Sequence, residues 1–346
     1  MPSHSWLLLD RESPRYRLPD DLRAHDPMAG HDCGWVEQML PFVRQFSRPG
    51  DTVFDPFAGF GTTLLAARLE DRLALGCEVD AGRIDLIRER LARHELAHGT
   101  TLLHGSCDAL DDAALPPFDL CLTNVPYFGC RWTGAPSASQ LYNSQSYAQH
   151  LDGLRNVFHR VRAGLREGGA CIAMVENIRL GDRVLPLAFD LARILGSLFS
   201  MEDERVLVYP HESDETDADT RTDRRHEYAL VFRKQRERID LQGTADLLDA
   251  LRAQGHAFTL FGSFVRWQQD PQSPPPADAD IRVDPDPQRL DALLQYLRDQ
   301  GFALTSWGDP VPLPIHFDSY RGRYYFRADR IDDQGALIRL DICYEQ

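Results

Sequence analysis

The chain has 346 residues, of which 43% are hydrophobic, and a formal net charge of −15 at pH 7. This length is enough for two domains of ordinary size, and this hydrophobic content is that of a globular protein, which excludes a disordered chain. The acidic balance argues against strong non-specific binding to a nucleic-acid backbone, because that binding comes largely from Lys and Arg.

The sequence carries no apolar run near the roughly 20 residues of a membrane span and no signal-peptide pattern at its start. We therefore expect a cytoplasmic protein that does not bind membranes. The seven cysteines lack paired C-x-x-C spacing. Reduced structural cysteines are the better interpretation, and zinc is not expected.

The first two thirds of the chain alternate between strand and helix patterns. After an irregular lead-in over residues 1–33, the predicted helices cover 35–46, 62–69, 84–94, 147–166 and 185–198. The predicted strands cover 51–55, 73–78, 101–103, 118–123 and 170–175, with a closing pair over 202–209 and 228–233. This alternation predicts an α/β fold, a mainly parallel Rossmann-like sheet with helices on both faces.

A charged stretch over Arg233–Arg238 lacks apolar periodicity. It predicts a boundary between a domain over residues 1–236 and a small α+β domain over residues 237–346. In the second domain we expect helices over 245–253 and 288–297, and strands over 258–261, 280–283, 303–307, 324–327 and 337–343. The proline-rich segment Pro271–Pro276 predicts a loop.

A glycine-rich turn lies between the first predicted strand and its helix. It reads Asp55-Pro-Phe57-Ala-Gly59-Phe-Gly61-Thr62-Thr63. The glycines permit a tight turn, and the helix N-terminus offers N–H groups to a ligand. We predict a binding site for S-adenosylmethionine (SAM), in which the Asp55 carboxylate accepts from the cofactor ammonium.

Two further acidic residues follow at spacings that suit the same cofactor. Glu78 ends the second strand, where its carboxylate can accept hydrogen bonds from both ribose hydroxyls. Asp108 follows the third strand and is placed to accept from the adenine amino group. The turn, Glu78 and Asp108 occur in this order, which a chance glycine-rich turn does not explain.

The segment Asn124-Val125-Pro126-Tyr127 follows the fourth strand, at the sheet edge where open α/β folds bind ligands. The Asn124 side-chain oxygen and the Val125 carbonyl can each accept one hydrogen of a planar amine, which directs the nitrogen lone pair at the cofactor methyl group. Pro126 stiffens the loop, and Tyr127 offers a face on which a base can stack. Phe128 or Trp132 is expected to add another wall.

At this point the chain resembles the amino-methyltransferases of nucleic acids, which carry D-P-F-x-G-x-G-T-T and [DNS]-P-P-[YF]. The resemblance covers roughly residues 30–235. It implies Asp55, Phe57, Gly59, Gly61, Thr62, Glu78 and Asp108 as cofactor residues and Asn124–Tyr127 as the catalytic segment. Its N-V-P-Y form is similar to the N-[LI]-P-[YF] of ribosomal RNA adenine dimethyltransferases, so adenine N6 or cytosine N4, in DNA or RNA, all stay open. The candidate target-recognition segments are Gly129–Ser146 and His211–Arg225.

The C-terminal region resembles the polymerase-β-like nucleotidyltransferases, which read G-S-x-x-R, then D-x-D, then a third Asp on a later strand. The matching residues are Gly262, Ser263, Arg266, Asp278, Asp280 and Asp341. The resemblance implies that the three aspartates hold Mg²⁺ and that the Gly-Ser turn binds a nucleoside triphosphate (NTP). A binding platform for the methylation substrate is the alternative.

Three hypotheses follow. The first is a SAM-dependent methyltransferase that acts on an exocyclic amine of a nucleic-acid base and carries an appended nucleotidyltransferase-like domain. The second keeps the methyl transfer but has a nucleotide, a small molecule or a protein amide as substrate. The third makes nucleotidyl transfer the main activity, with the SAM fold as a sensor. The oligomeric state stays open.

Overall fold

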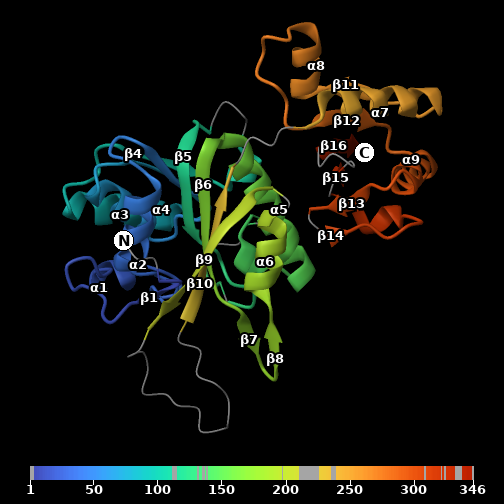
Figure 1. Ribbon diagram of the computed structural model, residues 1–346. Coiled ribbons are helices and arrows are strands. Elements are labelled where there is room, and N and C mark those ends of the chain that lie inside the picture. Colours follow the sequence, from blue (N-terminus) through green and yellow to red (C-terminus); the bar gives the residue numbers. More distant parts are fainter. Residues whose placement is uncertain are drawn as a thin grey trace. The chain divides into compact units, whose positions relative to one another are not determined.

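The computed structural model describes residues 4–110, 115–130, 132–134, 137, 139–196, 198–209, 226–234, 239–307, 309–320, 322, 325–331 and 337–344. The chain divides into two compact units, Met1–Gln235 and Arg236–Gln346. Figure 1 shows the elements of each unit.

The first unit is built on an eight-stranded sheet in the order β1-β9-β10-β6-β5-β2-β3-β4. Its strands are β1 (Trp6–Leu8), β2 (Thr52–Asp55), β3 (Leu73–Glu78), β4 (Thr100–His104), β5 (Phe118–Asn124), β6 (Leu165–Val175), β9 (Ser200–Val208) and β10 (His226–Arg233). All neighbouring pairs are parallel except those of β10, which runs antiparallel to both β6 and β9. The sheet is therefore the Rossmann-like one predicted from the sequence, closed by an antiparallel hairpin.

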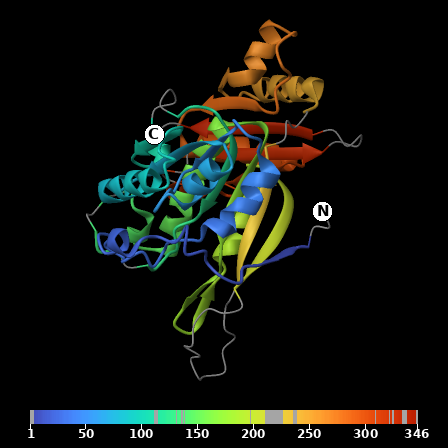
Figure 2. The same ribbon diagram turned by 90° about the vertical axis from the view of Figure 1, so that its left-hand side faces the viewer.

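Helices cover both faces of this sheet. They are α1 (Asp20–Arg23), α2 (Val36–Phe46), α3 (Thr62–Leu69), α4 (Ala81–Arg93), α5 (Tyr147–Gly164) and α6 (Leu187–Gly196). Helices α2, α3 and α4 lie on the face turned to the viewer in Figure 2, and α5 and α6 lie on the other. Side-chain caps start two of them, because Asp80 accepts from the Arg83 N–H and Ser146 accepts from the Gln149 N–H.

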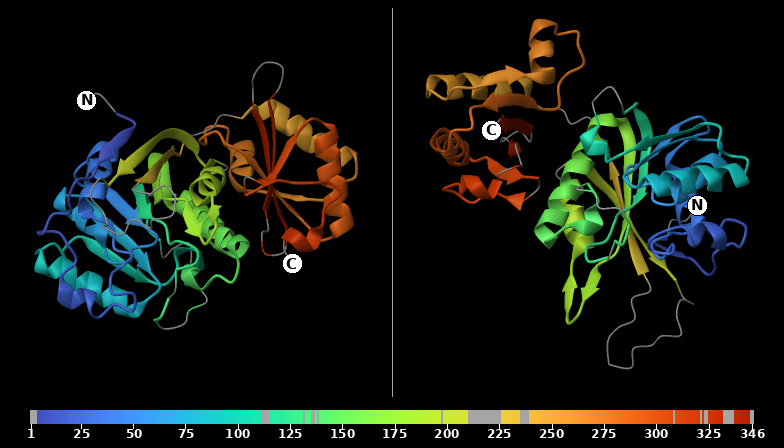
Figure 3. Two further views of the ribbon diagram at one scale, coloured as in Figure 1. Left: turned by 90° about the horizontal axis from the view of Figure 1, so that it is seen from below. Right: turned by 180° about the vertical axis from the view of Figure 1, so that it is seen from behind.

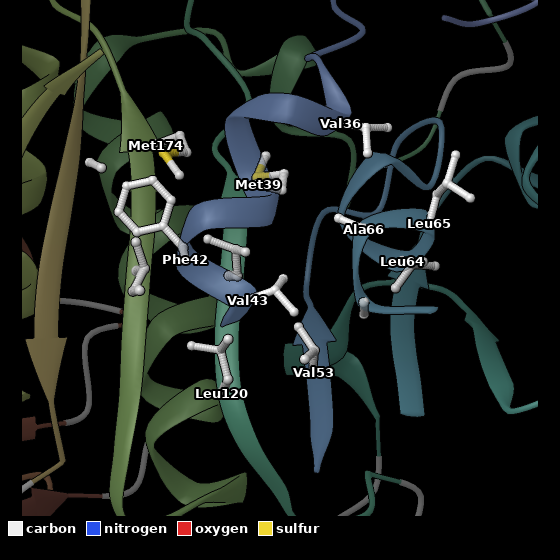
Figure 4. Close-up of a cluster of buried hydrophobic side chains, with 14 of the residues drawn as sticks. Val36, Met39, Phe42, Val43, Val53, Leu64, Leu65, Ala66, Leu120 and Met174 are labelled. Atoms are coloured by element: carbon white, nitrogen blue, oxygen red, sulfur yellow. The ribbon is translucent and has the colours of Figure 1, made fainter. Parts of the chain in front are cut away.

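The core of the first unit forms where α2 and α3 pack on the central strands. Figure 4 shows Met39 and Phe42 of α2 beside Val53 of β2, Leu120 of β5 and Met174 of β6. All five side chains are fully buried or nearly so. Burial of this apolar surface, at roughly 25 cal/mol per Å², holds α2 against the central strands.

Two short features differ from the sequence-based expectation. The lead-in over residues 1–33 is not wholly irregular, since β1 pairs with β9 and adds an edge strand. After β6, a hairpin of β7 (Ile178–Leu180) and β8 (Arg183–Leu185) projects from the sheet (Figure 1). The strands β1, β7 and β8 have three residues each, which is too short for side-chain periodicity to reveal them. The predicted recognition segment His211–Arg225 lies outside the described residues.

The second unit has a six-stranded sheet in the order β11-β12-β16-β15-β13-β14. Its elements are α7 (Leu241–Ala253), β11 (Thr259–Phe261), α8 (Gly262–Gln269), β12 (Ala279–Val283), α9 (Pro287–Asp299), β13 (Ala303–Ser306), β14 (Asp309–Pro310), β15 (Tyr325–Ile331) and β16 (Leu337–Tyr344). Alternate residues of the strands face a core shared with the helices. Figure 3 shows the strands of this unit beside their helices. Helix α8 was not predicted, and the segment Pro271–Pro276 is a loop as predicted.

Among the described residues, no helix is both long and apolar enough to cross a membrane.

Candidate functional site

A cavity of about 610 Å³ opens at the C-terminal edge of the first sheet. Asp55, Glu78 and Asn124 all line it, and each is the last residue of its strand, on β2, β3 and β5 respectively. These strands are neighbours in the order β5-β2-β3. The parallel sheet therefore brings together three side chains that the sequence separates by up to 69 positions (124 − 55).

The glycine-rich turn forms one wall of the cavity. Gly59 and Gly61 both have positive φ, at 52° and 72°, and Gly61 is the N-cap of α3. A β-carbon at Gly61 would lie 2.8 Å from Ile87 Cγ2, so this position needs both the conformation and the small size of glycine. Phe57, Gly59 and Thr62 line the cavity, whereas Gly61 shapes the turn from behind.

Asp55 is buried beneath this turn. Its Oδ1 accepts from the Thr123 hydroxyl at 2.6 Å and from the Phe57 N–H at 3.0 Å. Burial raises the pKa of this carboxyl to about 6 despite those hydrogen bonds. A buried carboxylate whose partners are neutral donors favours an added cation, such as an ammonium group, in the cavity.

Glu78 is held by two backbone N–H groups. Its Oε2 accepts from Gly59 and its Oε1 from Asp80, each at 2.9 Å. Burial raises the pKa of Glu78 to about 7. Each carboxylate oxygen has two lone pairs, so both oxygens keep an accepting direction for the hydroxyls of a ligand.

The catalytic segment predicted from the sequence lines the cavity along its whole length, from Asn124 to Tyr127. The Val125 N–H donates to the Met174 carbonyl at 3.2 Å, which fixes the peptide next to Asn124. The Thr123 hydroxyl bridges Asp55 and the Asn124 carbonyl, so the cofactor wall and the catalytic segment share one hydrogen-bonded residue. Burial raises the pKa of Tyr127 well above its ordinary value, so its hydroxyl stays neutral.

Three cavity residues beyond the predicted set form a hydrogen-bonded line that reaches Asn124 through Gln38. Gln38 Nε2 on α2 lies 3.5 Å from Asn124 Oδ1, a long hydrogen bond, and it also donates to Glu227 on β10. The Tyr209 hydroxyl donates to the same Glu227 carboxylate at 3.2 Å. No motif marks these residues, because they come from three distant segments that meet only in the folded sheet.

A second set of residues missed in the sequence closes the cofactor side. Arg83 on α4 is buried and pairs with Asp26 and Asp32, with N–O distances of 2.9 Å to each. Its guanidinium lies over the rings of Phe60 and Trp132, 4.5 and 4.9 Å from their centroids. The lead-in and the glycine-rich turn are thereby joined through one cation.

The segment Gly129–Ser146 contributes to the same cover. The Tyr142 hydroxyl donates to Asp32 at 2.8 Å, and Trp132 stacks on Tyr142. Residues 139–142 line the cavity. The described part of this segment therefore lies beside Asp32 and Arg83 at the cavity. Its predicted role in target recognition stays a prediction.

Three predicted side chains lie away from the cavity lining. Asp108 is exposed on a short turn of helix (η1, Cys107–Ala109), and Ser106 takes the nearby lining position. Phe128 packs against Tyr147 and His150 of α5, while Trp132 lies under the cover described above. Phe128 and Trp132 do not line the cavity in this structure, whereas Tyr127 does. The stacking of a target base at these side chains stays a prediction.

In the second unit, the predicted nucleotidyltransferase residues are only partly gathered. Asp280 pairs in register with Asp341 on the parallel strands β12 and β16. Gly262 begins α8 with a φ of 77°, and a β-carbon there would lie 2.2 Å from Asp280 Oδ2. Ser263 follows on α8, where Arg266 is exposed, and Asp278 is buried just before β12.

The Asp341 carboxylate is bound within the protein. Arg327 on β15 pairs with it through both oxygens at 2.9 Å, and the Tyr325 hydroxyl donates to it at 2.8 Å. No group of three or more His, Cys, Asp or Glu side chains is placed to hold a metal ion within the described part of the chain. Arg327 is thus the cation that this structure places on Asp341, and the magnesium site expected from Asp278, Asp280 and Asp341 stays a prediction.

Comparison with known proteins gives a family match that lies in the first unit. Residues 36–89 match the model of a family described as DNA methylase. The chain is 39% identical over 56 residues to the orphan methyltransferase M.BamHII of Bacillus amyloliquefaciens, covering 16% of this chain and 21% of that protein. It is 32% identical over 77 residues to the type II methyltransferase M.MjaI of Methanocaldococcus jannaschii, covering 22% of this chain and 25% of that protein.

The aligned segments thus span only about a fifth to a quarter of these relatives' lengths. Among solved structures, TrmN from Thermus thermophilus has a TM-score of 0.40 at 20% identity, covering 57% of this chain and 48% of that one. An rRNA methylase from Streptococcus thermophilus has a TM-score of 0.38 at 13% identity, covering 58% and 96%. The family match itself runs from the start of α2 into α4, and so contains the glycine-rich turn and Glu78.

Proposed function

We propose that the protein is a SAM-dependent N-methyltransferase that acts on the exocyclic amine of a nucleic-acid base, adenine N6 or cytosine N4. One observation carries the proposal. The Asn124 carboxamide lies in the same cavity as the buried carboxylates of Asp55 and Glu78, each at the end of its strand. The match of residues 36–89 to a DNA methylase model supports the same conclusion.

The residues present fit SAM. A cavity of about 610 Å³ is within the range of cofactor sites. Asp55 would hold the ammonium group and Glu78 the ribose hydroxyls, because both carboxylates are buried with neutral donors only as their hydrogen-bond partners in this structure. When bound there, the cofactor supplies an electrophilic methyl group.

The protein's own part in the chemistry is to prepare the amine. An exocyclic amine on an aromatic ring is a weak nucleophile because its lone pair is delocalised. Asn124 Oδ1 and the Val125 carbonyl each accept one amine hydrogen, which moves the nitrogen toward a tetrahedral geometry and localises its lone pair. The ring stacks on Tyr127, which stays neutral because its pKa is raised. Positioning and electrostatic stabilisation are sufficient for this step without a general base.

The substrate class is the less firmly supported part of the proposal. The names of the matching family and relatives favour DNA. The net charge of −15 favours a substrate that needs few phosphate contacts, such as a single base held in the cavity. A nucleotide, another small molecule or a protein amide is therefore the competing substrate class.

The test uses the full chain with tritium-labelled SAM. The label is offered separately to DNA, RNA, protein and metabolite fractions, and the methylated product is hydrolysed to identify the modified base. We expect label in a nucleic-acid fraction and a loss of roughly 100- to 1,000-fold in turnover for Asn124→Ala, with the affinity for S-adenosylhomocysteine (SAH) unchanged. Unchanged turnover in Asn124→Ala would contradict the proposed mechanism, and label confined to protein or metabolites would contradict the substrate.

Nucleotidyl transfer by the second unit is a separate candidate. The geometry that favours it is the turn at Gly262, which packs against Asp280 beside Asp341. Its test is Mg²⁺-dependent release of pyrophosphate from each NTP in turn, with Asp278→Ala and Asp280→Ala as controls. The ion pair of Asp341 with Arg327 opposes this activity, so we place it second to a role as a platform for the methylation substrate.

A further inference from the structure

A line of polar side chains crosses the target side of the cavity. It runs from Asn124 on β5 to Gln38 on α2, then to Glu227 on β10 and Tyr209 just after β9. All four residues line the cavity. The line therefore connects the residue proposed to bind the amine with three elements that surround it.

The hydrogen-bond polarity of this line has a fixed direction. An ionised carboxylate only accepts, so Glu227 requires a donor from Gln38, which is its Nε2. The same Nε2 then faces Asn124, which must present its carbonyl oxygen Oδ1 rather than its amide nitrogen. The charge on Glu227 thereby determines which end of the Asn124 carboxamide faces the target side.

Gly34 leaves room for both carboxamides, because it has no side chain. A β-carbon at Gly34 would lie 2.5 Å from Asn124 Nδ2 and 3.0 Å from Gln38 Oε1. Both atoms are the ends of their carboxamides that point away from the hydrogen bond between the two residues. The Gly34 carbonyl accepts from the Thr62 hydroxyl at 3.1 Å, so the glycine is fixed to the cofactor turn.

We propose that Gln38 and Glu227 are positioning residues that orient the Asn124 carboxamide for methyl transfer. This inference rests on the proposed function. Asn124 Oδ1 accepts from Gln38 along one lone pair and from the target amine along the other. If the polarity of the line is reversed, Asn124 presents its N–H₂ group to the target amine, and the hydrogens of the two groups repel each other.

The deciding variant reverses the line while keeping its hydrogen bonds. In Gln38→Glu combined with Glu227→Gln, the new amide donates to the new carboxylate, and Asn124 must turn its Nδ2 toward position 38. We expect thermal stability close to that of the wild type, unchanged SAH affinity, and a kcat lowered roughly 10- to 100-fold. A purely structural role predicts recovery of both stability and kcat in the double variant, and that outcome would overturn the proposal.

A matched control lies on the same helix. Gln45 of α2 accepts from Arg205 at 2.7 Å and does not line the cavity. Gln45→Glu makes the same chemical change and keeps that acceptor, so we expect no change in kcat. A decrease equal to that of the double variant would assign the effect to charge on α2 and not to Asn124.

A readout without turnover separates this inference from the proposed function. The chain contains only four asparagines, Asn124, Asn143, Asn156 and Asn177. Selective ¹⁵N labelling of asparagine gives four side-chain amide signals by NMR, and Asn124→Asp identifies one of them. In the reversed double variant we expect the Asn124 signal to shift while the other three stay in place.

The kcat and the Asn124 signal together distinguish failure of the positioning role from failure of the proposed function. If the Asn124 signal shifts but the wild-type protein methylates no nucleic acid, the orientation by Gln38 and Glu227 stands and the proposed function fails. If the wild type is active and the double variant changes neither the Asn124 signal nor kcat, the positioning role fails and the proposed function stands.

Discussion

Buried carboxylates are used differently in the two units. In the first unit, Asp55 and Glu78 end their strands at a cavity, and backbone N–H groups and one hydroxyl are their hydrogen-bond partners. In the second unit, Asp341 is as deeply buried but is paired through both oxygens with the Arg327 guanidinium. The first arrangement leaves both carboxyl groups with accepting directions for a cationic or hydroxylated ligand, whereas the second neutralises its charge internally.

The positive charge beside the buried Asp341 is supplied by Arg327, whereas no ion pair involves Asp55 or Glu78 among the described residues. The sequence predicted a ligand for both sets of carboxylates, from the glycine-rich turn and strand ends in the first unit and from the spacing of Asp278, Asp280 and Asp341 in the second. The raised pKa values of Asp55, about 6, and Glu78, about 7, mark sites where burial is not offset by a nearby counter-charge strong enough to keep the carboxyl ionised.

The largest expected effect follows from breaking the internal pair. Asp341→Ala leaves a buried guanidinium without its carboxylate, and we expect the free energy of unfolding of the second unit to fall by about 3–5 kcal/mol. Hydrogen exchange followed by mass spectrometry measures this unit by unit. Replacing both partners, as Arg327→Met with Asp341→Leu, should recover most of the lost free energy of unfolding. In the first unit, by contrast, Asp55→Ala should abolish SAH binding without destabilising that unit. Unchanged protection of β15 and β16 from hydrogen exchange in Asp341→Ala would contradict this difference between the two units.

The next effect concerns Arg83, a buried cation of the first unit. Arg83 pairs with Asp26 and Asp32 at the cover and not with Asp55 or Glu78 by any ion pair in the described residues. Arg83→Met keeps the length of the side chain but releases the lead-in, so we expect SAH affinity to fall by at least about tenfold, or about 1.4 kcal/mol. Isothermal titration calorimetry measures it. The exposed pair Arg88–Asp85 on the same helix supplies the control, since Arg88→Met should leave the affinity unchanged.

The pH dependence of cofactor binding tests the raised pKa values directly. Because the folded pKa values of Asp55 and Glu78 lie above 3.8 and 4.5, their contribution to stability is present at low pH and is lost as the pH rises through about 6 and 7. A ligand that donates hydrogen bonds to the ionised carboxylates of Asp55 and Glu78 favours their ionised form. SAH should therefore bind more tightly at pH 8 than at pH 6. The slope should approach tenfold per pH unit between pH 6 and 7, with proton release seen by calorimetry in two buffers. A flat profile would show that these carboxyls are already ionised in the free protein.

The smallest effect is expected at Asp108. The sequence placed this residue at the adenine amino group, but its side chain is exposed and outside the cavity lining. Asp108→Asn should therefore change SAH affinity by less than about threefold, within the usual range of a surface substitution. A tenfold loss in the same titration would restore the predicted adenine contact.

Much of the first unit was predictable because its signals are local. The limits of α3 and β3 agree with the predicted ones to the residue, since a glycine-rich turn and an apolar run mark their ends. Local patterns did not reveal β1 or the β7–β8 hairpin, because these strands have three residues each and owe their formation to their neighbours. Helix α8 was also missed, although it has eight residues, as many as α3. The lead-in likewise gave no sign of its link to Arg83.

Contiguous segments were enough to predict the parallel α/β sheet and the strand-end residues Asp55, Glu78 and Asn124, because side-chain periodicity and strand ends are local properties. The pairing of charges became visible only in the fold. The fold placed Arg327 on Asp341 and Arg83 on Asp26 and Asp32, and it assembled Gln38 and Glu227 beside Asn124. The physical reason is that a carboxylate's role depends on the dielectric and the donors around it, and these come from segments far apart in the chain.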